Sequence, residues 1–380
     1  MVTRRALLAS GAVGLGGIAG CAGGQPTLDG DGAGTDGAGD EGEATRIGLV
    51  GDLMLGRSVA DRWADDDDPE GVWGSTLPRL RELDALVGNL ECCVSDRGER
   101  WPDKVYYFRS PPSFAVPALK AAGASFVSLA NNHVLDYGEP ALRDTQRHLA
   151  DAGIARAGAG RNADAALEPA TFEAGDLTVA AFGLTDQSTA FAATDADPGT
   201  AFARLDPAVR ETRALVDDVL DRIAEHEPDL VVASLHWGAN WETEPRAVHE
   251  RFGRWLVEQG VDVVHGHSAH VLQGVEVYEG RPIIYDAGDF VDDYVSYRDR
   301  EGVYNKRSAL FELVVRDGDP AALDVVPTEI ADETARLANG EVAQWVRDTL
   351  AERSAAFGTE LEGVDGERDG GRLRIPLGGD

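Results

Sequence analysis

VVHGHSAHVLQGVEVYEGRPIIYDAGDFVDDY, residues 263–294, is the stretch that decides the fold of this chain. It contains the end of an apolar, β-branched run, residues 261–264, whose length and composition predict a buried strand. Two strand-like segments follow, 275–278 and 282–286, on either side of a Glu-Gly turn. The stretch closes on a Gly-Asp corner at 288–289. A buried strand that ends in polar residues predicts a functional site at that end.

Three histidines lie at the end of that predicted strand: His265, His267 and His270. Because side chains alternate along a strand, His265 and His267 point to the same side. His270 can return to them if the chain turns after Gly266. Neutral imidazole is the commonest nitrogen ligand of transition metals, so this spacing predicts a metal site. The alternative is a hydrogen-bonded turn with exposed histidines.

Strands and helices alternate along most of the chain. Four further apolar runs predict buried strands at 46–50, 85–87, 125–129 and 229–235. Helical segments separate them, and this alternation predicts an α/β core. A late pair of strand-like runs, 309–315 and 323–326, suggests a second sheet packed on the first.

Polar side chains of metal-ligand type follow these strands, at Asp52, Glu91, Asn132 with His133, and His236. In open α/β sheets, ligands gather at the carboxyl ends of the strands. Carboxylate, amide and imidazole groups together suit Mn, Fe or Zn, as one ion or as a pair. Taken singly, the residues also fit a turn, a surface charge or a helix cap. Their joint position at strand ends favours a divalent metal ion as cofactor.

The composition is strongly acidic, with a net charge of −32 over 380 residues. Only Lys104, Lys120 and Lys306 are lysines among 35 basic residues. Such a surface argues against nucleic acid as a partner, because phosphate binding needs a basic face. We interpret it as a solvated surface suited to high salt, which predicts a halophilic source. A surface that binds cations broadly is the alternative.

The N-terminus has the layout of an export signal. Residues 3–8 (TRRALL) have the form of a twin-arginine motif, and a weakly apolar region follows. Residues 17–21 (GIAGC) resemble a lipobox, which predicts lipidation of Cys21. We therefore expect an exported protein, lipid-anchored at the extracellular face of the cell membrane. The alternative is that Cys21 belongs to a discarded signal peptide.

The chain divides by composition into four parts. These are a signal over 1–21, a disordered Gly/Asp-rich linker over 22–45, one folded domain over 46–355 and a C-terminal tail over 356–380. The tail includes one apolar run, 372–377, that could add a short edge strand. Cys92 and Cys93 are adjacent, so no disulfide framework is expected, and we interpret both as buried apolar residues.

Six motifs in order resemble those of the capsule-synthesis CapA family, also called poly-γ-glutamate biosynthesis proteins. They are GDLMLGR (51–57), NLE (89–91), SLANNHVLDYG (128–138), LHWGANWE (235–242), HGHSAHVLQGVEVYEGRPIIY (265–285) and GDF (288–290). The match runs from about 46 to about 330. That family resembles the calcineurin-like metallophosphoesterases. The resemblance implies their fold, a four-layer α/β/β/α sandwich with two mixed sheets.

The resemblance also implies a set of metal ligands. They are Asp52, Glu91, Asn132, His236, His265 and His267. Two positions depart from the phosphoesterase pattern: Met54 stands where Asp-x-His has its histidine, and Asn89 stands where Gly-Asp has its aspartate. The last histidine, His270, comes one residue later than in Gly-His-x-His. A single-metal site, or a site that binds a polymer without cleaving it, therefore stays open.

The resemblance further implies that His133 is a general acid, oriented by Asp136. Capping of a helix is the alternative for Asp136. The expected substrate contacts are His270, Glu242, Arg109 and Trp237. His270 could instead be a metal ligand, and Trp237 could instead be a core side chain.

By this resemblance, the protein acts in the biosynthesis of poly-γ-glutamate or another anionic surface polymer of a capsule. Its expected activity is metal-dependent hydrolysis or transfer. Its expected partners are the polymer, membrane synthase subunits and the membrane itself, through the lipid anchor. One alternative is a non-catalytic polymer-binding or synthase-accessory subunit, which the missing Asp-x-His histidine favours. The other is a phosphoesterase of small phosphate esters, which the lack of a clear basic phosphate clamp disfavours.

Overall fold

The computed structural model describes residues 44–64, 68–294, 303–364 and 371–378. The expected signal, with Cys21, and residues 22–43 of the expected linker lie outside this part. Among the described helices, none combines the length and the apolar character that crossing a membrane requires.

The first sheet is built around β1 (Thr45–Leu53). Its strand order is β19 (Glu362–Gly363), β20 (Leu373–Pro376), β17 (Asp319–Ile330), β16 (Arg307–Arg316), β1, β2 (Ala85–Leu90), β5 (Ala124–Ser128) and β6 (Ala155–Ala157). Two short strands join it, β15 (Asp289–Val291) beside β1 and β18 (Ala335–Leu337) beside β17. Strands β1, β2, β5 and β6 are parallel, whereas β16 and β17 are antiparallel.

The late strands therefore do not form a second sheet, which corrects the expectation for 309–315 and 323–326. Strand β16 pairs with the free edge of β1 instead, from Thr45 opposite Val315 to Leu49 opposite Phe311. Nothing local in the sequence marks that edge as open. Strand β20 covers most of the apolar run at 372–377, and it lies between β17 and β19.

The second sheet has the order β13 (Val275–Tyr278), β14 (Arg281–Ile284), β12 (Val263–His267), β11 (Leu230–His236), β9 (Leu177–Thr185) and β8 (Ala170–Ala174). Its four central strands are parallel and its outer strands antiparallel. Central strands such as β11 read as continuous apolar runs because they are buried on both faces.

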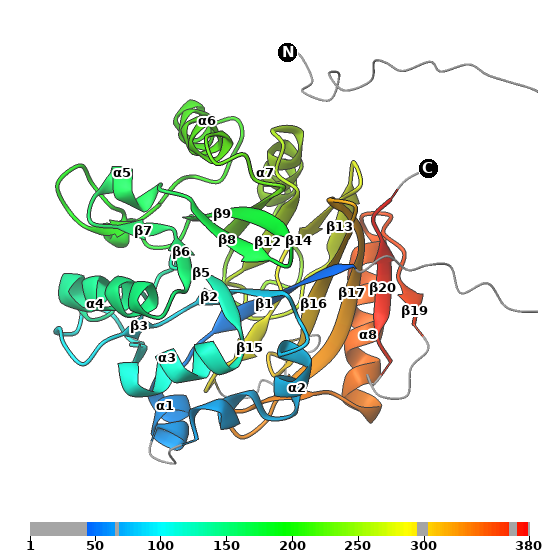
Figure 1. Ribbon diagram of the computed structural model, residues 1–380, viewed down its shortest axis with the longest axis horizontal. Coiled ribbons are helices and arrows are strands. Elements are labelled where there is room, and N and C mark those ends of the chain that lie inside the picture. The colour runs from blue at the N-terminus through cyan, green and yellow to red at the C-terminus, as the bar shows by residue number, and fades with distance from the viewer. Residues whose placement is uncertain (1–43, 65–67, 295–302, 365–370, 379–380) are drawn as a thin grey trace, which may run out of the picture. The chain divides into compact units, whose positions relative to one another are not determined.

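Apolar side chains of the two sheets pack against each other, among them Leu49, Val87 and Val232. Helices α1 (Arg57–Trp63), α3 (Pro112–Ala121) and α4 (Gly138–Asp151) belong to the core on the outer face of the first sheet. Helices α6 (Arg210–Ala224) and α7 (Ala247–Glu258) cover the second sheet (Figure 1). This arrangement confirms the predicted four-layer α/β/β/α sandwich with two mixed sheets.

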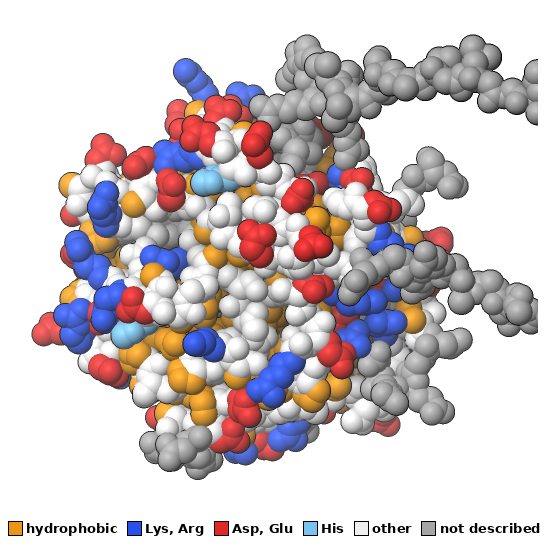
Figure 2. Space-filling view, viewed as in Figure 1, with side chains coloured by type: hydrophobic (Ala, Val, Ile, Leu, Met, Phe, Trp, Pro, Cys, Tyr) orange, Lys and Arg blue, Asp and Glu red, His pale blue; other side chains and the backbone are white. Residues whose placement is uncertain are grey.

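Shorter elements complete the fold. Helix α8 (Gly340–Ala355) packs across β13, β16 and β17. The others are η1 (Pro69–Thr76), α2 (Leu77–Leu80), β3 (Cys93–Val94), β4 (Arg109–Ser110), β7 (Ala159–Gly160), α5 (Ala163–Ala166), η2 (Thr189–Phe191) and β10 (Gly199–Thr200). Acidic side chains are spread over the face seen in Figure 2, with Lys and Arg among them.

Candidate metal centre

The site lies where the carboxyl ends of strands from both sheets meet. Asp52 and Asn89 are register partners on β1 and β2, and His236 and His267 are register partners on β11 and β12. Gly51 lets the backbone close in, because a Cβ there would lie 1.7 Å from the carbonyl oxygen of residue 288. The parallel strands thus bring side chains far apart in sequence to one point, as the sequence predicted.

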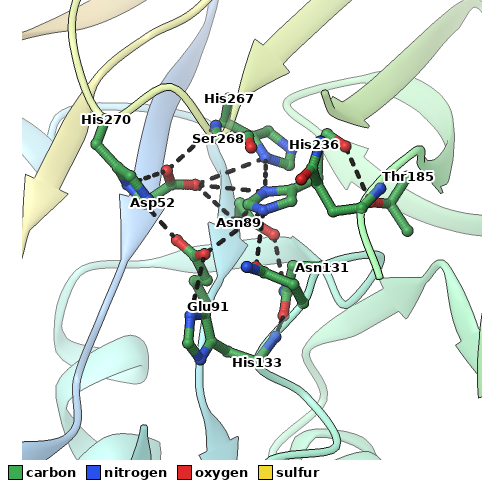
Figure 3. Close-up of polar contacts among 12 residues, drawn as sticks. Asp52, Asn89, Glu91, Asn131, His133, Thr185, His236, His267, Ser268 and His270 are labelled. Carbon is green, nitrogen blue, oxygen red and sulfur yellow. Dashed lines mark hydrogen bonds and ion pairs between the residues drawn. The ribbon is translucent and has the colours of Figure 1, made fainter. Parts of the chain in front are cut away.

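A first group of possible metal ligands consists of Asp52, His236 and His267 (Figure 3). Asp52 Oδ1 lies 3.6 Å from His267 Nδ1 and 4.0 Å from His236 Nδ1. The two imidazole nitrogens are 2.9 Å apart. Two nitrogens bound to one ion lie at about this separation, since metal–nitrogen bonds are about 2.0–2.1 Å.

Neighbouring polar groups orient both imidazoles of the first group. His236 Nε2 donates to Asn132 Oδ1 at 3.0 Å, and His267 Nε2 is hydrogen-bonded to Ser234 Oγ at 3.0 Å. A proton on Nε2 leaves the lone pair of the His236 ring on Nδ1. His267 Nδ1 lies 2.9 Å from that atom, so it either donates a hydrogen bond to it or, with its own proton on Nε2, offers a second lone pair to a cation between the two rings.

A second group consists of Asp52, Glu91 and His270. His270 Nδ1 lies 3.2 Å from Asp52 Oδ2, 3.9 Å from Glu91 Oε2 and 2.8 Å from Asp289 Oδ1. Asp52 therefore belongs to both groups, one carboxylate oxygen to each. Figure 3 shows Asp52 between His270 and the pair formed by His236 and His267.

A strained turn brings His270 back to the site. Ser268 and His270 have φ angles of 113° and 59°, which side chains other than glycine rarely adopt. Ala269 lies between these two residues, and two hydrogen bonds hold its backbone. Ala269 N donates to Asp286 Oδ2 at 2.6 Å, and the Ala269 carbonyl accepts from Trp241 N at 2.8 Å. The turn thus places the ring of His270 beside Asp52, Glu91 and Asp289.

The donors fit a cation because several buried polar atoms are otherwise unsatisfied. Both carboxylate oxygens of Glu91 and Oδ2 of Asp289 have no hydrogen-bond partner in the described part of the chain. Leaving such groups buried and unpaired costs about 1–3 kcal/mol each. The five side chains of the two groups are at most 2% exposed. These buried Asp, Glu and His side chains could hold a metal ion.

The pKa values of the histidines at the site are shifted in different directions. Burial lowers the pKa of His236 to about 3, and burial and the neighbouring histidines lower the pKa of His267 well below its usual value. Both rings are therefore neutral, as metal ligands must be. Burial also acts to lower the pKa of His270, but Asp289, Tyr294 and Glu91 outweigh it and raise that pKa well above its usual value.

The pKa of the Glu91 carboxyl group differs from that of an ordinary surface glutamate. Burial and the nearby charge of Asp52 raise its pKa well above the usual value. Burial and Asp52 likewise raise the pKa of Asp286. A divalent cation would reverse this shift, because it compensates the negative charges that oppose ionisation.

His133 lies beside the second group, and Asp136 holds the ring nitrogen that faces away from Glu91. Its Nδ1 donates to Asp136 Oδ2 at 2.7 Å, and its Nε2 lies 3.9 Å from Glu91 Oε1. Burial lowers the pKa of His133 to about 4, against the effect of Asp136. The neutral ring therefore presents Nε2 as a proton acceptor. Asp136 also accepts from Phe108 N at 2.6 Å and makes no cap bond to α4, so it orients His133.

The remaining predicted residues lie at different distances from this centre. His265 is buried on β12, with its Nδ1 3.4 Å from Ser234 Oγ, and is in neither ligand group. Asn132 contacts the ring of His236. Glu242 pairs with Arg246 at 3.0 Å, next to α7. Arg109 stacks over Tyr137 at the rim, with its Cζ 4.0 Å from the ring centroid.

Trp237 belongs to the core of the second sheet, which corrects its expected role as a substrate contact. It is 2% exposed, and its Nε1 donates to the carbonyl oxygen of Tyr285 at 2.7 Å. Its ring stacks on His249 and Tyr285, with centroid distances of 4.8 and 6.2 Å. No face of the indole is free for a ligand.

Sequence reasoning missed several polar groups at the site: Asn89, Asn131, Asp289, Asp286, Ser268 and Lys104. Asn89 Nδ2 donates to Asp52 Oδ1 at 2.7 Å, and Lys104 contacts Asp136 and the carbonyl of Asn132. The Gly-Asp corner at 288–289 was the available signal for Asp289. Nothing local in the sequence distinguished Lys104 from the other two lysines, Lys120 and Lys306.

Comparison with known families settles the relationship. The family model of the bacterial capsule synthesis protein PGA_cap matches residues 46–294. The chain belongs to this family. The resemblance drawn from the six motifs is thereby confirmed, and the matched range contains every residue of the two ligand groups.

Relatives extend over most of the chain. A "probable polyglutamine synthesis accessory protein" of Mycobacterium tuberculosis is 34% identical over 324 residues, which is 82% of this chain and 84% of the relative. The "capsule biosynthesis protein CapA" of Bacillus anthracis is 32% identical, over 77% of this chain and 69% of its own length. The "PGA biosynthesis protein CapA" of Bacillus subtilis is 28% identical, over 75% and 72%.

Proposed function

We propose that this PGA_cap family protein acts in the synthesis of poly-γ-glutamate or a comparable anionic surface polymer, as a metal-dependent hydrolase or transferase. The names of its relatives support the polymer. The observation that carries the activity is the buried cluster around Asp52, in which neither oxygen of Glu91 has a hydrogen-bond partner among the described residues. A purely structural cluster would satisfy that carboxyl group.

Asp52, His236 and His267 would hold one ion, and Asp52, Glu91 and His270 a second. The mixture of imidazole and carboxylate donors suits Mn, Fe or Zn. A bound ion of this kind activates water and polarises the carbonyl or phosphoryl oxygen of the scissile bond.

His133 moves the proton in this proposal. Near neutral pH its ring is uncharged, Asp136 accepts from Nδ1, and Nε2 accepts a proton from the attacking group. Once protonated, His133 donates to the leaving group as the general acid. Asp136 stabilises the imidazolium in the interval, because its carboxylate remains 2.7 Å from Nδ1.

A non-catalytic accessory role is the second candidate, and a specific observation favours it. Met54, at the position of the Asp-x-His histidine, is fully buried among apolar side chains. The M. tuberculosis relative is also named an accessory protein. In this case the cluster around Asp52 would hold a metal that shapes the cleft for a polymer or a synthase subunit.

We also propose that the protein works at the outer face of the cell membrane, anchored by lipid on Cys21. The twin-arginine form of residues 3–8 and the lipobox-like residues 17–21 support this location. A polymer exported to the surface would meet the protein there.

Elemental mass spectrometry tests the proposal. Protein purified in high salt without chelator should contain one or two equivalents of Mn, Fe or Zn. The variant His267→Ala should lose metal, whereas His226→Ala, at an exposed position on the turn after α6, should keep it. Metal-loaded protein should then cleave γ-glutamyl oligomers. Cleavage of phosphate esters alone would point to a phosphoesterase, and metal without cleavage of either would favour the accessory role.

A further inference from the structure

A cleft of about 430 Å³ lies between α1, the loop before β4 and the start of α4. Three arginines, Arg57, Arg100 and Arg109, line it together with Tyr107 and Tyr137. The chain as a whole has 67 acidic and 35 basic residues, so three guanidinium groups in one cleft are more than its acidic composition leads one to expect. Arg57 pairs with Asp293 Oδ2 at 3.0 Å, so Arg100 and Arg109 are the guanidinium groups that remain for an anionic ligand.

Two of these arginines differ from most others in what they contact. Arginines elsewhere in the described chain are commonly held by carboxylates, such as Arg79 by Glu312 at 2.6 Å. Arg109 instead stacks over the ring of Tyr137, and Arg100 lies over Tyr107 with its Cζ 4.9 Å from the centroid. No carboxylate of the described residues lies within ion-pair distance of either guanidinium.

Stacking leaves the edge of a guanidinium free. When the face of such a group rests on an aromatic ring, its N–H bonds point outward in the plane. Arg100 uses part of that edge to bond Tyr137, which raises its pKa. The remaining donors form a fork whose geometry matches the two oxygens of a carboxylate.

The side chain of Phe108 lies between the cleft and the candidate metal centre. The ring of Phe108 packs edge-on against His133, with centroids 4.6 Å apart, and Arg57 Cζ lies 4.9 Å from the centroid of Phe108. Arg109 and Tyr137 follow Phe108 and Asp136 in the chain, so the hydrogen bond from Phe108 N to Asp136 Oδ2 also positions the cleft wall. A group bound by the arginines would lie one side-chain layer from His133.

We propose that this cleft is a subsite for the carboxylate groups of the anionic polymer, with Arg100 and Arg109 as the residues that bind them. The proposal rests on the proposed function, because it assumes that a polymer occupies the metal centre. Asp61 and Asp96 also line the cleft and are exposed. These two carboxylates repel a phosphate monoester, which carries nearly two negative charges, more strongly than they repel a singly charged carboxylate.

Binding of a fluorescently labelled γ-glutamate oligomer to the full-length protein tests this subsite. Fluorescence anisotropy would be measured with a chelator present, at the lowest salt concentration that keeps the protein folded, because salt screens exposed charges. Arg100→Gln and Arg109→Gln should each weaken binding roughly tenfold, which corresponds to about 1.4 kcal/mol. Arg109→Lys should recover only part of the loss, because lysine keeps the charge and lacks the fork.

Arg143→Gln is the matched control, since Arg143 is an exposed arginine on α4 that pairs with Glu139. It changes the net charge equally and should leave the affinity unchanged. Equal affinities for the wild type and both glutamine variants would overturn the subsite, as would the absence of binding by the wild type. Tighter, arginine-dependent binding of inorganic polyphosphate would overturn the carboxylate assignment. The metal content of each variant, measured in parallel, reports separately on the metal centre.

Discussion

Replacing Glu91 with Gln should make the metal-free protein more stable and the metal-loaded protein less stable. The change keeps the size of the side chain and removes its negative charge. In the folded protein both carboxylate oxygens are buried without a hydrogen-bond partner in the described chain, and Asp52 lies close by. Without metal, that charge is a cost to folding. In the proposed metal-loaded protein, the same charge would be a ligand.

The size of the effect without metal follows from proton linkage. Burial and Asp52 raise the pKa of Glu91 above the value of about 4.5 in the unfolded chain. Between these two pKa values the folded state keeps a proton that the unfolded state has released, so the wild type loses stability as pH rises. The loss is at most about 1.4 kcal/mol per pH unit. Glu91→Gln has no carboxyl group that titrates at this position. The free energy of unfolding of the variant should therefore equal that of the wild type near pH 4.5 and exceed it increasingly at higher pH.

The effect with metal has the opposite sign. An ion at 100 times its dissociation constant stabilises the protein that binds it by about 2.7 kcal/mol. The wild type should gain this stabilisation, and the variant should lose the share that belongs to the second ligand group. The two proteins should therefore exchange rank when metal is added.

Urea unfolding followed by circular dichroism measures both effects, with chelator or with Mn, Fe or Zn, at several pH values between 5 and 7.5. Glu312→Gln is the control, because Glu312 is a buried carboxylate whose oxygens accept from Arg79 at 2.6 and 2.7 Å. Breaking that pair should cost roughly 3–5 kcal/mol with and without metal. A pH-independent loss of stability in Glu91→Gln, or an undiminished response to metal, would refute the reasoning.

Three further predictions concern other parts of the chain. Trp237→Ala should lower the free energy of unfolding by about 3–5 kcal/mol, because it empties a core position, while the affinity for a γ-glutamate oligomer stays unchanged. Weaker binding of the oligomer by variant protein that is fully folded would show that Trp237 contacts the substrate. Burial raises the pKa of the Cys92 thiol to about 12, so iodoacetamide should modify the native protein at pH 8 far more slowly than the urea-unfolded protein, as mass spectrometry would report. Equal rates would show that the thiol is accessible. Cys21→Ser should move the protein from the membrane to the soluble fraction of lysed cells and remove the mass of the lipid. Retention in the membrane would exclude lipidation as the anchor.

Much of the local structure could be predicted from the sequence because it depends on near neighbours. The expected strand over 229–235 is β11, shifted by one residue. The helices α3 and α4 end where Gly123 and Gly153 adopt φ angles of 74° and 76°, which glycine reaches without steric cost. The parallel strands then bring their polar ends together, so Asp52 and His236 were found from strand ends alone.

Long-range pairing decided what the sequence could not. Strand β16 has the apolar pattern of any buried strand, and only its pairing with β1 assigns it to the first sheet. Trp237 follows a strand end, as a ligand-binding tryptophan would, and only packing against Tyr285 and His249 makes it a core side chain. Asp289 reaches His270 because β15 pairs with β1.

The sequence by itself determined the order of the elements, the family and the strand ends at which chemistry lies, because periodicity, turns and motifs are local patterns. Only the tertiary structure decided which of those polar groups share a site. Asp52 and His270 are separated by 218 positions in the numbering (270 − 52), yet Asp52 Oδ2 and His270 Nδ1 lie 3.2 Å apart. That distance depends on two packed sheets and a strained turn, and no local pattern encodes it.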